Sequence, residues 1–174
     1  MLALHSVKPG SPEVAHARTL FAHYRAFLET IESTHCFDFA HYQDEIATLP
    51  AAYTDANGEL LIALLDDTPT ACIAFRHAAG EPATTCEIKR LFVLPDHRAK
   101  GIARALIAES LTRAATHHFT RAILDTDIVS MPAAYATYLT FGFTEYTPTG
   151  PHAPSLRFLE RTLPVIIGRY SEAV

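Results

Sequence analysis

Hydrophobic and polar positions in the first fifty residues follow two different spacings. Residues 2–8 alternate between apolar and polar, which predicts a short first strand that stops at Pro9-Gly10. Ser11-Pro12-Glu13 then supplies a capping hydroxyl and a proline at the first helical position, which is a typical helix start. The apolar residues that follow recur at helical spacing as far as Ile31, and a second, shorter helix is expected over Phe39 to Leu49.

Three strands are expected in the middle of the chain. Asn57-Gly58 is a turn signal, and it precedes the apolar strand Glu59 to Leu65. After a turn at residues 66–69, Thr70 to His77 is expected to return as the hairpin partner. A longer strand follows from Thr84 to Leu94. These three strands therefore predict an antiparallel run.

The remaining chain predicts alternating helices and strands. In order they are a helix from Ile102 to about His118, a strand from Ala122 to Asp125, a helix from Pro132 to Phe141, and strands from Phe143 to Thr147 and Leu156 to Leu163. The antiparallel run thus leads into one right-handed βαβ crossover. We expect an α/β (α+β) fold with about seven strands and four helices, as a single domain over residues 1–163 with a tail over residues 164–174.

Composition narrows the class of protein. The 174 residues are 49% hydrophobic, which is enough for one sizeable core. Fourteen basic and nineteen acidic residues give a net charge of −5, which argues against a nucleic acid partner. The three cysteines are widely spaced and favour a reducing compartment. With no signal peptide pattern and no apolar run of about 18 residues, we expect a cytoplasmic protein without a membrane partner.

The turn after the long strand combines small and basic residues. It reads Leu94-Pro95-Asp96-His97-Arg98-Ala99-Lys100-Gly101-Ile102-Ala103, and a helix begins within it. Helix-start N–H groups, the helix dipole, Arg98 and Lys100 all add positive potential, while the small Gly101 and Ala103 let a ligand approach the backbone. This combination suits a pyrophosphate. The turn lacks the glycine patterns of nucleoside triphosphatases and of dinucleotide folds.

Arg98-x-x-Gly101-x-Ala103 resembles the acyl-CoA pyrophosphate loop of the GCN5-related N-acetyltransferase (GNAT) family. The preceding strand, from Cys86 to Pro95, is similar to that family's fourth strand, and Ala134-x-x-x-Tyr138-x-x-x-Gly142-Phe143 is similar to its later helix and strand. The resemblance implies that the fourth and fifth strands splay apart and that acetyl-CoA lies in the slot, without a metal. Implied contacts to coenzyme A are Phe92, Val93, Leu94, Arg98, Ala99, Lys100, Gly101, Ile102, Ala103 and Arg104.

The resemblance also implies catalytic roles. Glu87 is the candidate base, and plain alternation would place Glu87, Lys89, Leu91 and Val93 on one face of the strand; the alternative is that Glu87 only pairs with Lys89 or Arg90. The backbone N–H of Val93 is the candidate oxyanion donor.

Tyr138 is the candidate general acid for the departing thiolate. Its alternative role is core packing, and Tyr135 is a competing tyrosine on the same helix. Cys86 is expected to be a core residue, and the ten histidines lack metal-ligand spacing. Asp125 and Asp127, at the end of the fifth strand, either bind substrate or cap the next helix.

Family architecture implies an acceptor site built from residues 34–42 and 147–155. An acidic and aromatic mouth there would suit a cationic amine; the alternative is ordinary helix packing with solvated charges. The residues concerned are Phe37, Asp38, Phe39, Tyr42, Asp44, Glu45 and Tyr53. The expected function is acetyl transfer to a primary amine of a small molecule or peptide through a ternary complex, by a monomer or homodimer. The alternative function is a non-catalytic acyl-CoA sensor.

Overall fold

A single seven-stranded sheet organises the chain. The computed structural model describes residues 1–31 and 38–166. The strands lie in the order β1-β2-β3-β4-β5-β7-β6, and every neighbouring pair is antiparallel except β4 and β5, which are parallel. This mixed, mostly antiparallel sheet confirms the predicted fold class.

The elements follow the predicted order. The strands are β1 (Leu2–Ser6), β2 (Glu59–Leu65), β3 (Thr68–His77), β4 (Thr85–Val93), β5 (Arg121–Asp127), β6 (Thr144–Tyr146) and β7 (Leu156–Thr162). The helices are α1 (Glu13–Glu29), α2 (Phe39–Ala47), α3 (Ala51–Thr54), α4 (Ile102–Thr116) and α5 (Pro132–Thr140), with a 3₁₀ turn at Pro95–His97. The described residues thus contain the four predicted helices and the short α3, which was not predicted.

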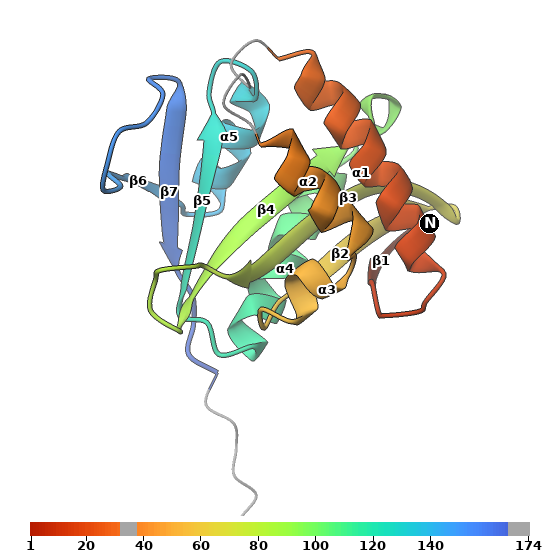
Figure 1. Cartoon of the computed structure of the whole chain (residues 1–174), viewed down its shortest axis with the longest axis horizontal. Helices are drawn as coiled ribbons and strands as arrows, with labels where there is room; N and C mark the ends of the chain where they lie inside the picture. The colour runs from red at the N-terminus through yellow and green to blue at the C-terminus, as the bar shows by residue number, and fades with distance from the viewer. Residues whose placement is uncertain (32–37, 167–174) are drawn as a thin grey trace, which may run out of the picture.

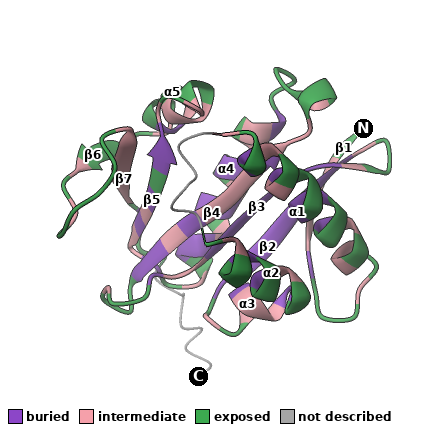
Figure 2. Cartoon of the chain, turned by 45° about the horizontal axis from the view of Figure 1, so that its top comes forward, coloured by how far each residue is buried: buried purple, intermediate pink, exposed green. Residues whose placement is uncertain are grey.

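Helices cover both faces of the sheet, as Figure 1 shows. On one face α1, α2 and α3 enclose a core cluster that includes Leu20, Phe21 and Tyr42. On the other face α4 and α5 enclose a second cluster that includes Leu106 and Tyr138. Successive residues of β2 belong to alternate clusters, so that this strand is buried on both sides (Figure 2).

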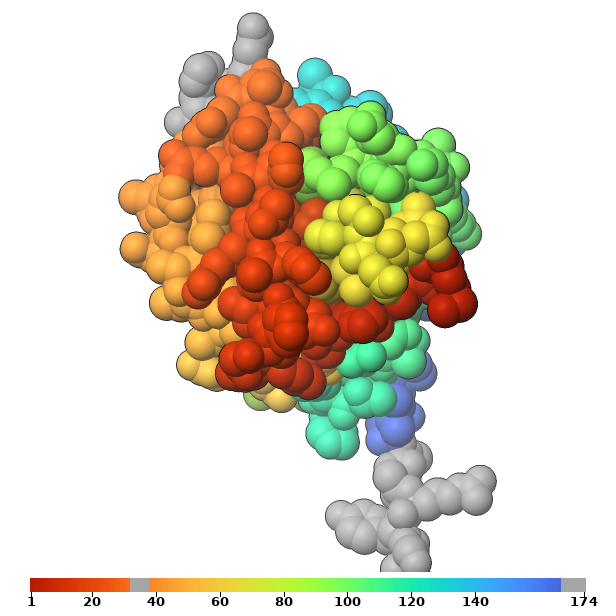
Figure 3. All heavy atoms as spheres, turned by 90° about the vertical axis from the view of Figure 1, so that its right-hand side faces the viewer, coloured from red at the N-terminus to blue at the C-terminus, as the bar shows by residue number. Residues whose placement is uncertain are grey.

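The N-terminal strand closes one edge of the sheet. β1 pairs with β2 over its full length, from Leu2 opposite Leu65 to Ser6 opposite Leu61. The N-terminal ammonium pairs with Asp66 in the β2–β3 turn, and Figure 3 shows these first residues beside that turn. The functional features described below lie away from this edge.

β4 carries a bulge that divides it into two halves. Lys89 lies opposite Ala74 in β3, but Phe92 lies opposite Cys72, so β4 has one residue more than β3 in this stretch. Arg90 sits in the bulge with a left-handed φ of 61°. Because side chains alternate along a strand, one extra residue exchanges the two faces of everything that follows.

The predicted alternation along β4 was therefore wrong. Glu87 points to the α1–α3 face, as does Lys89, whereas Leu91 and Val93 pack against the α4–α5 cluster. Plain alternation had placed all four on one face. The bulge at Arg90 is the physical reason, and nothing in the residue pattern marks it.

After Glu87, β4 also separates from β5. The two strands pair only at Thr85, Cys86 and Glu87 of β4, opposite residues 121–123 of β5. Figure 1 shows them side by side at this end and diverging toward the other. The sheet is therefore splayed between its fourth and fifth strands, as expected.

Candidate functional site

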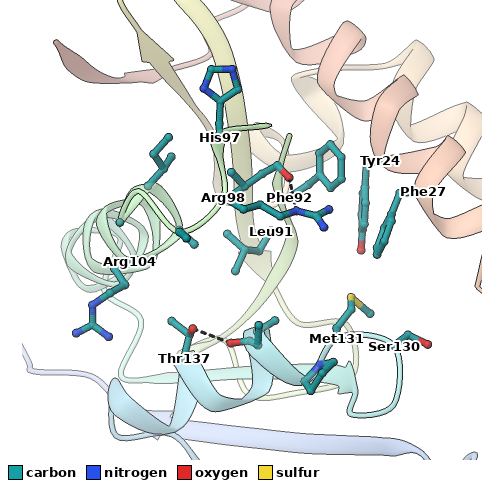
Figure 4. Close-up of a pocket in the computed structure, with 18 residues that line it drawn as sticks. Tyr24, Phe27, Leu91, Phe92, His97, Arg98, Arg104, Ser130, Met131 and Thr137 are labelled. Carbon is teal, nitrogen blue, oxygen red and sulfur yellow. Dashed lines mark hydrogen bonds between the residues drawn. The ribbon is translucent and has the colours of Figure 1, made fainter. Parts of the chain in front are cut away.

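A cavity of about 570 Å³ opens where β4 and β5 diverge. Its walls come from α1, the end of β4, the turn that leads into α4, and the start of α5 (Figure 4). Eight of the ten residues predicted to contact coenzyme A line this cavity, namely Phe92, Val93, Arg98, Ala99, Gly101, Ile102, Ala103 and Arg104. The chain thus gathers the predicted loop and the strand edge around one space.

The turn into α4 exposes its backbone to the cavity. Ala99 and Gly101 both adopt left-handed φ angles, of 59° and 78°. Gly101 is the N-cap residue of α4, and a Cβ added to it would meet nothing within 4 Å. The N–H groups of the first helical turn have no partners within the helix, so that they present a positive end to this open space. An anion is the ligand that such an end favours.

Two basic side chains of the turn differ in their placement. Arg98 lines the cavity: its Nε donates to the Val93 carbonyl at 3.1 Å and its guanidinium lies 5.4 Å from the ring centre of Phe27. Lys100 does not line the cavity, and its Nζ donates to the Asp96 carbonyl at 2.9 Å. Neither cation forms an ion pair with a carboxylate within the described part of the chain. Arg98 is therefore the better placed to meet an anionic ligand.

The edge of β4 that faces the cavity is a free backbone edge. The Leu94 N–H donates to the Thr70 carbonyl of β3 at 2.9 Å. Successive N–H groups of a strand point to opposite edges, so the Val93 N–H points away from β3 and into the slot where pairing with β5 has ended. Leu94 itself is turned to the α1–α3 core and does not line the cavity.

Glu87 lies at the narrow end of the slot, outside the cavity lining. One carboxylate oxygen accepts from Arg76 Nε at 2.7 Å, and the other accepts from Lys89 Nζ at 3.2 Å. The side chain is half-buried. A carboxylate has about four acceptor sites, so Glu87 keeps acceptor capacity for a water or an amine.

Tyr138 is buried on α5, beneath the cavity. Its ring packs edge-on against Phe143 at 5.6 Å. Burial raises the pKa of its hydroxyl far above the usual range, and the neighbouring Tyr24 and Asp125 raise this pKa further. The competing Tyr135 instead donates to Glu145 at 2.6 Å on the exposed side of the helix. Tyr138 is not among the residues that line the cavity, but its hydroxyl lies within electrostatic reach of Tyr24 on α1 and Asp125 on β5, and burial keeps it protonated.

The two aspartates at the end of β5 have different surroundings. Asp127 accepts from the N–H groups of Val129 and Ser130 and from the Ser155 hydroxyl, so it caps the turn before α5. The Asp125 carboxylate is exposed and has no hydrogen-bond or ion-pair partner among residues 1–31 and 38–166. Of the two roles considered, capping belongs to Asp127 alone.

Three residues of the predicted acidic and aromatic mouth belong to the core instead. Tyr42, Tyr53 and Glu45 are buried beneath α1, so packing between helices accounts for them. Phe37 lies outside the described residues. The alternative of ordinary helix packing was the better interpretation for these side chains.

The candidate thiol nucleophile is a core residue. Cys86 is fully buried, and burial raises the pKa of its thiol to about 12.

No group of three or more His, Cys, Asp or Glu residues suited to a metal is found in the described ranges. Within the same ranges, no helix has the length and apolar character needed to cross a membrane.

Ten of the residues that line the cavity were not among the predicted coenzyme contacts, and four of them illustrate the reason. Tyr24 and Phe27 form its wall on the α1 side, and Ser130 and Met131 enter from the loop after β5 (Figure 4). Tyr24 and Phe27 appear in the sequence only as members of the apolar face of a helix. Nothing local indicates that this face continues past the sheet into the slot.

A sheet splayed between parallel β4 and β5, with an anion-binding turn at the splay, is the architecture of an acyl-CoA-dependent acetyltransferase. Residues 19–143 match the model of the acetyltransferase (GNAT) family, and the chain belongs to that family. This confirms the resemblance seen in the loop, the fourth strand and the later helix.

Individual relatives agree with this assignment. An uncharacterized N-acetyltransferase of Schizosaccharomyces pombe is 32% identical over 112 residues, a stretch that spans 63% of this chain and 66% of that protein. An acetyltransferase of the GNAT family from Staphylococcus aureus Mu50 shares the fold with a TM-score of 0.71, at 16% identity, over 94% of this chain and 100% of its own. The PaiA N-acetyltransferase of Thermoplasma acidophilum, solved in complex with coenzyme A, has a TM-score of 0.67 at 16% identity, over 93% and 99% of the two chains.

Proposed function

We propose that this protein transfers the acetyl group of acetyl-CoA to a primary amine of a small molecule or peptide, by direct transfer within a ternary complex. The observation that carries the proposal is the shared cavity, because the anion-binding turn and the free edge of β4 face the same space. A diphosphate bound by the turn would leave the thioester arm to run along that edge. The coenzyme A complex of the Thermoplasma relative supports this use of the fold.

In this proposal the chain supplies three groups to the reaction. The Val93 N–H polarises the thioester carbonyl while the amine nitrogen attacks its carbon. Glu87 accepts the proton that the amine loses, directly or through water. Tyr138 donates its proton to the departing thiolate, so that the products are the amide and coenzyme A with its thiol. A protonated Tyr138 is consistent with the effect of burial on its hydroxyl.

The acceptor side of the slot favours a cationic substrate. Asp125 lies beyond the last β4–β5 pair, and Phe158 is its partner on β7. Burial is the main cause that raises the pKa of Tyr24, Tyr138 and Tyr146, and the negative charge of Asp125 adds to this rise in each case. Asp125 therefore lies within electrostatic reach of tyrosines from three different elements. We propose that an ammonium group of the acceptor occupies this position, with aromatic faces beside it.

The alternative of a non-catalytic acyl-CoA sensor makes a different prediction. A sensor needs the turn and the β4 edge, but it has no use for Glu87 or for a buried tyrosine beside the thioester. The decisive experiment measures thiol release from acetyl-CoA over a panel of amines, together with binding of acetyl-CoA by titration. We expect turnover on at least one cationic amine, and about a 100-fold loss of kcat in Glu87→Gln.

Two results would count against the transferase. Tight binding of acetyl-CoA with no turnover on any amine would favour the sensor. Absence of binding would refute both, since each depends on the turn at residues 98–103. The matched control is Glu109→Gln, which removes a carboxylate from an ion pair with Arg113 on α4, away from the slot.

A further inference from the structure

The bulge in β4 is held by a buried ion pair that reaches across to α2. Arg90 Nε and one terminal nitrogen of its guanidinium donate to the two oxygens of Glu45, at 2.9 and 2.8 Å. The Glu45 side chain is only 1% exposed and that of Arg90 is 10% exposed. The Tyr53 hydroxyl also donates to Glu45, and the guanidinium lies 4.7 Å from the ring centre of Tyr42. One strand and two helices therefore meet at this pair.

Both members of the pair remain charged. Burial opposes the ionised form of Glu45, but the hydrogen bonds and positive charge of Arg90 outweigh it and lower the pKa of this carboxyl. Buried ion pairs are seldom needed for stability, since apolar side chains of similar volume often replace them without loss. Their best attested use is to select one register among several. The register in question here is that of β4 on β3.

The backbone conformation at Arg90 also depends on the contacts around it. Its φ of 61° is unfavourable for a residue with a side chain, and the bulge persists because the surrounding contacts hold it. The Cys72 thiol lies 3.4 Å from the Arg90 carbonyl and adds a weak contact from β3. The side chain and the backbone of Arg90 are thus both fixed.

Register decides which N–H groups enter the slot. With the bulge in place, Leu94 donates to Thr70 in β3 and Val93 points outward. Without the extra residue the alternation would reverse, so that Val93 would point to β3 and its neighbours would face the slot. The identity of the backbone donor at the thioester therefore depends on a side-chain contact made by Arg90.

We propose that the Arg90–Glu45 ion pair is a positioning device, which fixes the bulge so that the Val93 N–H faces the reacting carbonyl. The inference rests on the proposed function, because it concerns the group that polarises the thioester. It also means that α2 directly contacts the part of β4 that orients this N–H. Arg90 and Glu45 are positioning residues, and neither lines the cavity.

The test measures hydrogen bonding to the thioester carbonyl directly. Acetyl-CoA labelled with ¹³C at the carbonyl is bound to the protein, and its infrared C=O stretch is compared with that of the free thioester. In the natural protein a hydrogen bond from Val93 should move the stretch to lower frequency. In Arg90→Ala, which removes the guanidinium but keeps the cost of a left-handed φ, and in Glu45→Gln, the stretch should return toward the free value.

Kinetics should change in parallel. Loss of one oxyanion donor lowers kcat by about 100-fold or more, whereas the dissociation constant of coenzyme A should stay within about threefold because the turn at residues 98–103 is untouched. Arg90→Lys keeps the positive charge but loses the bidentate contact with Glu45, so its kcat should lie between those of the natural protein and the other Arg90 variant. The control is Glu59→Gln, which alters a buried carboxylate that pairs with Arg113 and is separated from β4 by β3, and it should leave the stretch unchanged.

Each outcome bears on the inference. If the folded variants keep the stretch frequency of the natural protein and a normal kcat, the inference is overturned and the ion pair is a purely structural contact. If neither single variant folds, the double variant Arg90→Met/Glu45→Met, which replaces the pair by apolar side chains, carries the test. If the natural protein binds acetyl-CoA and turns over but shows no shift, the positioning role fails while the proposed function stands. If it binds no acetyl-CoA, the proposed function itself fails.

Discussion

The two sides of the slot are built in different ways. The proposed coenzyme side is a short continuous stretch, residues 93–104, which brings backbone N–H groups, a glycine and Arg98 together. The proposed acceptor side draws on side chains from separate elements: Tyr24 on α1, Glu87 on β4, Asp125 on β5 and Tyr138 on α5. A contiguous site can be recognised from a short motif. A dispersed one depends on how distant segments pack.

The largest effect is expected on the coenzyme side. Gly101→Glu should abolish binding of acetyl-CoA, because it adds bulk and negative charge where a diphosphate is expected, and forces a side chain into a left-handed conformation. Titration calorimetry measures this directly. Gly80→Glu is the matched control, since Gly80 has a φ of 82°, equally open surroundings and a position outside the cavity lining. Equal affinity in the two variants would refute the placement of the turn.

The next effect is expected at the thioester. Tyr138→Phe should lower kcat by about 100-fold and leave the KM of acetyl-CoA nearly unchanged, because only the proton delivered to the thiolate is lost. Since burial raises the pKa of Tyr138, its hydroxyl stays protonated throughout the usual assay range and should produce no alkaline loss of rate below pH 10. Steady-state rates as a function of pH give both results. Tyr135→Phe serves as the control, and a comparable loss there would reverse the assignment.

A smaller effect is expected for the acceptor. Asp125→Asn should raise the KM of a cationic amine by about tenfold, in keeping with the loss of one partly exposed charge contact of about 1.4 kcal/mol. The KM of acetyl-CoA should not change. The kcat/KM of an uncharged or anionic amine should rise relative to the kcat/KM of the cationic amine. Equal effects on cationic and neutral amines would show that Asp125 does not select charge.

The smallest expected effect is a difference in acetyl-CoA affinity between variants of Lys100 and Arg98, the two cations of the turn. Lys100→Ala should weaken acetyl-CoA binding by less than threefold, because Lys100 does not line the cavity, whereas Arg98→Ala should weaken it by about tenfold. Parallel titrations at two salt concentrations measure both. A larger effect at Lys100 than at Arg98 would show that the bound state rearranges the turn.

The sequence allowed more of the fold to be predicted than of the site. The order of strands and helices follows from local periodicity, and the ends of β2 and the start of α5 coincide with the predicted residues. The bulge in β4 could not be predicted, because Glu87 to Val93 contains no glycine or other local sign of an extra residue. The ion pair that holds it joins positions 45 residues apart. The α1 wall of the cavity was missed for the same reason, since an apolar helix face looks the same over a sheet as over a slot.

By itself, the sequence determined the element order, the turn proposed to bind an anion and the family, because each of these depends on residues close together in the chain. Only the tertiary structure decided which face Glu87 occupies, which backbone N–H enters the slot, and that Asp127 rather than Asp125 caps the turn before α5. These features depend on contacts between segments far apart in sequence. One extra residue in a strand reverses every side chain after it, and the packing of Arg90 against Glu45 determines where that residue lies.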